Sequence, residues 1–232
     1  MSTSPSSSST SLSSLASTPE DQLFEACYNN QLEDVKRLLE QHAALKVNKL
    51  MANGWGALHH PSMKDHVAIV KILLQHPTID VNLTTMWGGT PFSLACSSGS
   101  TGVVKELLAD QRVEINAPDK YGATPLWKAS HEGNLEAVKW ILASGRKVDL
   151  GAKDKNWSFT ALETAKNRAI EEIGRNRNSQ SAVGLEVRRK NCPLIVNFLE
   201  RFKNNMEQTM ADLRKELGIT GNSSSSSSFI SP

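Results

Sequence analysis

Histidine and aspartate side chains gather in one stretch of the chain and have the chemistry to hold a metal ion. The residues are His59, His60, Asp65, His66 and His76. On a helix, His59 and His60 would point about 100° apart, so they could not both ligate one ion. His66 and His76 fall in the following turn and at the end of the next predicted helix. The spacing therefore favours structural histidines over a metal site.

Glycine-rich segments and nucleophilic side chains are the other places where chemistry could occur. The segments NGWGALHH and SSGSTG are similar to parts of phosphate-binding loops, but neither follows a predicted strand or carries the lysine of a Walker motif. The chain has no GxSxG motif, and no serine or cysteine is spaced to pair with a base and an orienting acid. We predict no catalytic residue, no cofactor and no metal.

Charge and cysteine content exclude several classes of protein. The 26 Lys and Arg residues nearly balance the 24 Asp and Glu residues, and a net charge of +2 is too small to favour nucleic acid or an anionic membrane as a partner. Cys27, Cys96 and Cys192 form no CxxC pair, so we expect neither a disulfide framework nor a zinc site. The N-terminus lacks a signal-peptide core, and no stretch is apolar for long enough to span a bilayer. We expect an intracellular protein, cytoplasmic or nuclear and not secreted.

A period of 34 residues organises the middle of the chain. The columns that carry this period are Leu58, Phe92 and Leu126; Gly54, Gly88 and Gly122; and Val70, Val104 and Val138. The pairs Leu73-Leu74, Leu107-Leu108 and Ile141-Leu142 keep the same step, as do Asn82 and Asn116. A fixed period of this length predicts repeated units that stack on one another.

Within one unit the pattern predicts a turn, a short helix, a second turn and a longer helix. Thr124 is suited to cap the first helix and Pro125 to occupy its first position. Gly133-Asn134 would end that helix and cap the next. The second helix places Leu135, Val138, Ile141 and Leu142 on one face. Neither helix could bury its apolar face alone, so stacked units must share a continuous core.

The segments WGGTPFSLACSSGSTGVVKELL and YGATPLWKASHEGNLEAVKWIL resemble ankyrin repeats. The shared features are a turn glycine, a TPL-type opening, a glycine in mid-unit and a V-x-x-L-L helix. This resemblance runs from about Pro19 to Phe202 and implies an all-α solenoid of paired antiparallel helices with β-turn or hairpin fingers. It also implies that His59 makes a structural hydrogen bond to the turns. A solenoid lacks the enclosed pocket that most catalysis needs, so we do not expect an enzyme.

The period divides the chain into a repeat domain over residues 18–202 and two low-complexity ends. We place the units near 18–51, 52–85, 86–119, 120–153 and 154–202. The first unit, whose apolar pattern runs from Leu23 to Leu39, is degenerate because it lacks a TPL opening. The serine-rich ends, 1–17 and 219–232, have too few apolar residues to offset the entropy of ordering, so we predict that they are disordered.

Three features depart from the regular unit. An insertion over about 167–191, rich in arginine, separates the two helices of the fifth unit, and we interpret it either as a flexible surface loop or as a basic docking loop for an acidic partner. Pro61 lies inside the first helix of the second unit, which should kink or start late. A closing helix over 203–218 should bring Phe202, Met206, Met210, Leu213 and Leu217 onto one face, either to cap the last repeat or to bind a partner helix.

Aromatic residues recur in the predicted fingers, which with the first helices form the usual contact surface of the family that the chain resembles. Trp55, Trp87, Tyr121 and Trp157 either anchor a partner or pack on the neighbouring finger. Flanking residues complete the predicted partner-binding set: Met86, Lys120, Lys128, His131 and Glu132.

The resemblance implies a protein partner, which the sequence does not identify. We predict a monomeric protein–protein interaction module that acts as a scaffold or adaptor through its concave face and finger turns. The alternative is a regulatory subunit or inhibitor that occludes a single enzyme or transcription factor. Several weak partners would favour the first hypothesis, and one tight target with lost activity would favour the second.

Overall fold

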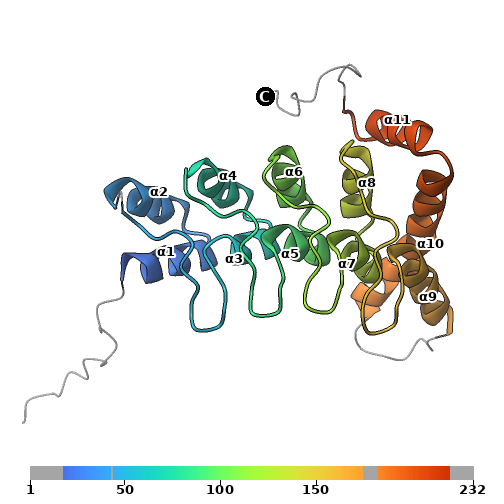
Figure 1. Cartoon of the computed structure of the whole chain (residues 1–232), viewed down its shortest axis with the longest axis horizontal. Coiled ribbons are helices and arrows are strands. Elements are labelled where there is room, and N and C mark those ends of the chain that lie inside the picture. Colours follow the sequence, from blue (N-terminus) through green and yellow to red (C-terminus); the bar gives the residue numbers. More distant parts are fainter. Residues whose placement is uncertain (1–17, 43, 175–181, 220–232) are drawn as a thin grey trace, which may run out of the picture.

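The chain forms two rows of helices that run side by side along the molecule (Figure 1). The computed structural model describes residues 18–42, 44–174 and 182–219. The first row contains α1 (Pro19–Tyr28), α3 (His59–Met63), α5 (Pro91–Ser98), α7 (Pro125–Glu132) and α9 (Ala161–Gly174). The second row contains α2 (Leu32–Gln41), α4 (Val67–Gln75), α6 (Thr101–Ala109) and α8 (Leu135–Ala143). Two further helices, α10 (Ala182–Asn204) and α11 (Met206–Glu216), close the C-terminal end.

The inner helices of the third and fourth units begin and end as their residues predict. The Thr90 and Thr124 side chains cap α5 and α7 by accepting hydrogen bonds from the Ser93 and Trp127 amides, and a proline follows each threonine. Gly133 ends α7 in the left-handed conformation, with φ of 74°. These predictions are confirmed. Throughout the described residues the regular secondary structure is helical, so the predicted all-α solenoid is confirmed as well.

The predicted side-chain cap at Asn134 is wrong. Asn134 stands at the start of α8 but makes no capping hydrogen bond there. Its amide instead donates to the carbonyl oxygens of Cys96 and Ser97, at 2.9 and 2.8 Å, at the end of α5 in the preceding unit. Because the ends of neighbouring inner helices lie side by side, this side chain satisfies carbonyls that α5 leaves unpaired.

One hydrophobic core runs through all the units. It contains the predicted leading residues Leu58, Phe92 and Leu126 and the predicted valines of the outer helices, Val70, Val104 and Val138, each at most 2% exposed. Adjacent inner helices contact one another, as do adjacent outer helices. Each unit therefore buries its apolar faces against its neighbours, as the stacking argument requires.

The first two units begin differently from the central ones. Thr18 and Asp21 form a capping box at the start of α1, and Pro19 follows the capping threonine. Counted from the leading leucine of the unit, this threonine and proline lie three residues earlier than in the later units. In the second unit, α3 starts two residues later than α5 does once the period of 34 is subtracted, and no side chain caps it. The predicted late start is confirmed. The helix starts late because Gly56 and Ala57 stand where the later units have threonine and proline.

Helical structure extends into the predicted insertion. Residues 167–174 continue α9 and residues 182–191 form the first part of α10, while 175–181 lie outside the described residues. The prediction of a surface loop is therefore wrong for the described part. The first part of α10 packs on the turn after α7. The side-chain amide of Asn191 donates to the Gly133 carbonyl at 2.9 Å, and a Cβ on Gly133 would lie 3.0 Å from the Arg188 Cα atom.

The last helix packs on the outer helix of the fourth unit. Lys139 of α8 pairs with Glu216 at 2.8 Å, and Arg214 donates to the Ala143 carbonyl at 3.0 Å. Leu213 is fully buried, whereas Met206 is 52% exposed and Thr209 is buried in its place. The prediction that Met206 shares the packed face is wrong, because α11 begins at this residue and Phe202 belongs to α10. The helix covers the end of the core, as a cap does.

Candidate protein-binding face

Hairpin-like loops, which we call the fingers, connect the units and project on one side of the inner helices (Figure 1). Each finger closes on itself: the Thr85 amide donates to the Gly89 carbonyl, and the Asp119 amide donates to the Ala123 carbonyl. Neighbouring fingers are also joined. The Lys120 amide donates to the Trp87 carbonyl at 3.1 Å, and the Lys155 amide donates to the Tyr121 carbonyl at 2.7 Å. These bonds fix the fingers in one row. We call this row, together with the inner helices behind it, the finger face.

Large apolar side chains stand exposed at the finger tips. Met86 is 51% exposed, Trp87 58%, Tyr121 45% and Trp157 57%. Trp87 and Tyr121 stack across adjacent fingers, with ring centroids 6.4 Å apart and an angle of 18° between the rings. One part of each ring therefore contacts its neighbour, which confirms the packing between these two fingers, and a large part of each ring faces solvent. Their role as anchors for a partner stays a prediction.

Trp55 differs from the other finger aromatics. It is half-buried, whereas the other finger aromatics are exposed. Its ring lies against the imidazoles of His59 and His60, with ring centroids 6.0 and 6.2 Å away. It follows the turn glycine Gly54, whereas Trp87 and Tyr121 precede theirs. The structure therefore places Trp55 apart from the exposed tips.

A hollow of about 230 Å³ lies between the last two described fingers and α7. Five of the predicted partner-binding residues line it, namely Tyr121, Lys128, His131, Glu132 and Trp157. Its aromatic wall is built by Trp127, whose ring is nearly parallel to those of Trp157 and His131, at centroid distances of 6.2 and 5.0 Å. We number each finger by the unit that it begins, so that residues 119–123 form the fourth finger and residues 154–159 the fifth. The Trp127 indole donates to the Phe159 carbonyl at 3.1 Å, which holds the fifth finger against α7.

The charged residues around the hollow are paired with one another. Lys128 forms a 2.8 Å ion pair with Asp119, and both side chains are largely buried. Nδ1 of His131 donates to Glu132 at 2.9 Å, and Arg188 of α10 pairs with the other oxygen of the same carboxylate. The hydrogen bond from His131 holds the pKa of the Glu132 carboxyl below its usual range, with the Arg188 charge acting in the same direction and burial against it. Lys128 and Glu132 are therefore already engaged within the protein.

The family model described as ankyrin repeats (3 copies) matches residues 14–85 and 78–154. The chain belongs to the ankyrin repeat family. No curated protein matches the sequence. The family match covers the first four units, so the fifth ankyrin unit, with its lengthened helices α9 and α10, lies beyond the matched residues.

His59 has the structural role that the ankyrin resemblance implies. Its Nδ1 accepts the Gly56 amide at 2.8 Å and its Nε2 donates to the Leu83 carbonyl at 2.7 Å, joining two fingers. His66 and His76 flank the two ends of α4, as predicted. Within the described residues, no group of three or more potential ligands surrounds a metal position, and no helix is long and apolar enough to cross a membrane.

Three residues that shape the ankyrin finger face escaped sequence reasoning. Trp127 was hidden because it occupies a helical position one residue after the buried Leu126, where an inner-helix core residue was equally expected. Asp154 is buried and accepts the amides of Asn156, Trp157 and Phe159, a role that its place at the start of the fifth finger could have suggested. Arg188 lies in the insertion, whose contact with α7 has no repeat-based signal.

Proposed function

We propose that this ankyrin repeat protein is a scaffold or adaptor that binds partner proteins through its finger face, with Trp87, Tyr121 and Trp157 as anchors. One observation carries the proposal: these three aromatics are 45 to 58% exposed and stand together on three adjacent fingers, each stacked on a neighbouring ring. Exposed aromatic clusters on a soluble protein mark interaction sites, because each ring gains a large buried area when a partner covers it.

The fingers are suited to present anchors because their backbones are fixed before binding. Inter-finger hydrogen bonds and the Trp127–Phe159 bond hold the finger backbones in place, so a partner would have to order little backbone on this surface. A preorganised surface loses less conformational entropy on association and binds more tightly for the same buried area. Lys120, Lys128, His131 and Glu132 surround the anchors and would contribute mainly to specificity.

Ankyrin repeat proteins are typically interaction modules without enzymatic activity, and the scaffold proposal is consistent with that general role. The occluding-inhibitor alternative uses the same face and differs in the number of targets. Counting the proteins that bind this face, and measuring whether any of them loses activity, distinguishes the two functions.

The test is affinity capture from cells with the wild-type chain and with the double variant Trp87→Ala/Tyr121→Ala. We expect the double variant to capture at least about tenfold less of each partner than the wild type does, since hot-spot aromatics contribute about 2 kcal/mol or more to binding. A matched control is Ile170→Ala/Met206→Ala, which removes two exposed apolar side chains outside the fingers. This control should capture the same partners as the wild type.

The double variant should also keep its fold. Each of the two substitutions removes a ring that is about half exposed, so the free energy of unfolding should change by about 1 kcal/mol or less per site, measured by urea denaturation. Captured proteins that are retained in full by a folded double variant would show that the finger tips do not bind partners.

A further inference from the structure

We propose that the finger face recognises an extended acidic segment of the partner that also carries apolar side chains. This inference rests on the proposed function and specifies the chemistry of the partner. It is carried by the charge on the fourth and fifth fingers, which expose lysines to solvent and turn their carboxylates inward. We call Lys120, Lys153 and Lys155 the finger lysines.

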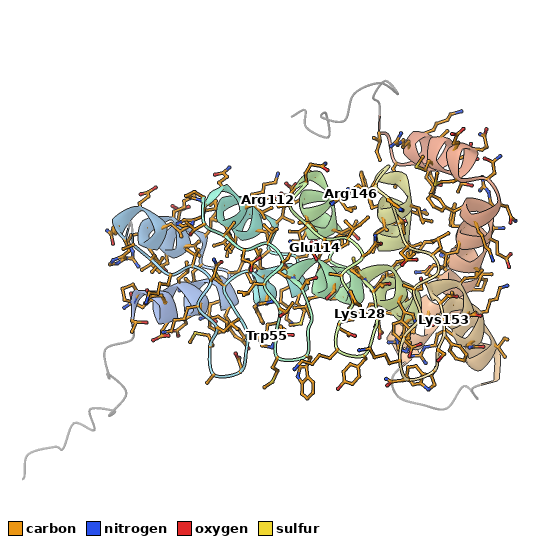
Figure 2. All side chains as sticks on the ribbon, viewed as in Figure 1. Trp55, Arg112, Glu114, Lys128, Arg146 and Lys153 are labelled. Atoms are coloured by element: carbon orange, nitrogen blue, oxygen red, sulfur yellow. The ribbon has the colours of Figure 1, made fainter. Side chains whose placement is uncertain are left out.

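The three finger lysines are exposed: Lys120 and Lys155 lie within the closed fingers that carry Tyr121 and Trp157, and Lys153 directly precedes the second of these fingers. Lys153 lies on the finger side of the molecule in Figure 2, whereas Arg112 and Arg146 lie among the outer helices on the opposite side. The Lys155 ammonium reaches the Lys120 carbonyl at 3.2 Å, so two lysines of different fingers come together. The lysines and aromatics thus lie on the same two adjacent fingers, and we call this set the strip.

The carboxylates of the same fingers do not neutralise the finger lysines. Asp119 accepts the Tyr121 and Ala123 amides and pairs with Lys128, and its side chain is only 8% exposed. Asp154 is 3% exposed and is occupied by three backbone amides of its own finger. Among the charged side chains of the described fourth and fifth fingers themselves, those that face solvent are therefore lysines, while Lys153 also interacts electrostatically with the exposed Glu163 of α9.

Acidic side chains of a partner would complement this positive strip, and apolar side chains would complement the aromatics between the lysines. The hollow beside Tyr121 and Trp157 provides a place for one such side chain, with the ring of Trp127 as its wall. The fingers lie in a row (Figure 1). A partner segment that contacts the finger lysines as well as the aromatic tips therefore runs along that row in an extended form.

A polypeptide fits the strip better than a nucleic acid. Tight binding of nucleic acid uses many cationic contacts to phosphates, whereas the chain has a net charge of +2 and only three finger lysines on the described fingers. The aromatic tips also stack on neighbouring rings of the protein, which leaves less of each ring face for a base.

The experiment measures fluorescence anisotropy with a labelled synthetic peptide of repeated Glu-Asp-Leu. We expect the full chain to bind this peptide and to release it as the salt concentration rises, because exposed charges are screened. The triple variant Lys120→Glu/Lys153→Glu/Lys155→Glu should bind at least about tenfold more weakly, the size expected when like charges face one another across an interface. A peptide of repeated Glu-Asp-Ser should also bind more weakly, because it lacks the apolar side chains.

The matched control is Lys190→Glu/Lys203→Glu/Lys215→Glu, which has the same net charge but changes exposed lysines of α10 and α11. It should bind the acidic peptide as the wild type does, apart from a small uniform decrease. Equal losses in both triple variants, tighter binding of a poly(dT) oligonucleotide than of the peptide, or no binding of the peptide would each overturn the proposal. Partners that are still captured through Trp87 and Tyr121 while the acidic peptide fails to bind would leave the proposed function standing.

Discussion

The fingers and the loops that follow the outer helices repeat with the same period but use it differently. In the outer loops an asparagine recurs at positions 48, 82 and 116, and each one makes the same pair of bonds to the next unit. The Asn82 amide donates to the Arg112 carbonyl at 2.8 Å, and its side-chain oxygen accepts the Glu114 amide at 2.8 Å. Asn48 bonds Thr78 and Asp80 in this way, and Asn116 bonds Lys147 and Asp149.

At the finger tips the repeated position changes from unit to unit. The residue before the turn glycine is Trp87 in one finger and Tyr121 in the next, while the equivalent positions in the fingers on either side are Asn53 and Lys155. These side chains make no common bond between units in the described fingers. A repeated residue with a repeated bond serves the stacking of the units, and a variable exposed residue on the same framework is free to serve a partner.

The strongest test of this contrast replaces the turn glycine beside Trp87. Gly88 has φ of 79°, and a Cβ there would lie 2.9 Å from the Lys120 amide nitrogen of the next finger. Gly88→Ala should lower the free energy of unfolding by about 3 kcal/mol, from the left-handed backbone and the clash together. Urea denaturation measures this loss.

Gly218→Ala is the matched control for that substitution. Gly218 has φ of 68°, but within the described residues no atom lies within 4 Å of the added Cβ. This variant should lose only about 1 kcal/mol, the cost of the backbone conformation alone. Equal losses at the two glycines would mean that the close contact between fingers has no energetic weight.

A smaller effect is expected in the outer loops. Asn82→Ala removes both bonds to the next unit and should lower the free energy of unfolding by about 2 kcal/mol, at roughly 1 kcal/mol for each hydrogen bond. Asn82→Asp keeps the acceptor for the Glu114 amide and should fall between the wild type and the alanine variant. Asn197 is exposed on α10, so Asn197→Ala is the control and should change stability by less than about 0.5 kcal/mol. An alanine at position 82 that is tolerated as well as one at position 197 would remove the basis for the comparison.

The sequence predicted what local patterns and the ankyrin resemblance specify, and it missed what depends on contacts between units. The period of 34 and the cap at Thr124 follow from patterns of the central units, the late start of α3 follows from the local sequence around Pro61, and the structural bond of His59 follows from the resemblance. The helical insertion could not be found in this way, because α10 is supported by its contact with the Gly133 turn rather than by a pattern of its own. Asn134 was misplaced for a related reason: a capping residue can bond its own helix or the neighbouring unit, and only the stacking decides.

The same limit applies to the candidate site. The ankyrin resemblance and the spacing together placed Tyr121, Lys128, His131, Glu132 and Trp157 near one face, and the structure brings them to one hollow. Spacing did not show that Lys128 and Glu132 are engaged in ion pairs, because their partners lie nine residues away in a finger and 56 residues away in α10. Whether a charged residue is available to a partner thus depends on contacts between units, which the period does not encode.

The smallest expected effect concerns pH and tests whether the fingers depend on a neutral imidazole. Burial lowers the pKa of His59, which must be neutral for Nδ1 to accept the Gly56 amide while Nε2 donates to Leu83. Because the unfolded chain binds the proton more readily, the contribution of His59 to the free energy of unfolding is fully present above the unfolded pKa of about 6.5 and falls as the pH drops towards the folded pKa.

Between about pH 7.5 and 5, the free energy of unfolding of the wild type should therefore decrease, and His59→Gln should show a shallower slope. Part of the slope remains in the variant, since burial and the charges of His66 and Lys64 also lower the pKa of His60. Identical slopes in the two proteins would show that His59 bridges the fingers without a requirement for its neutral form.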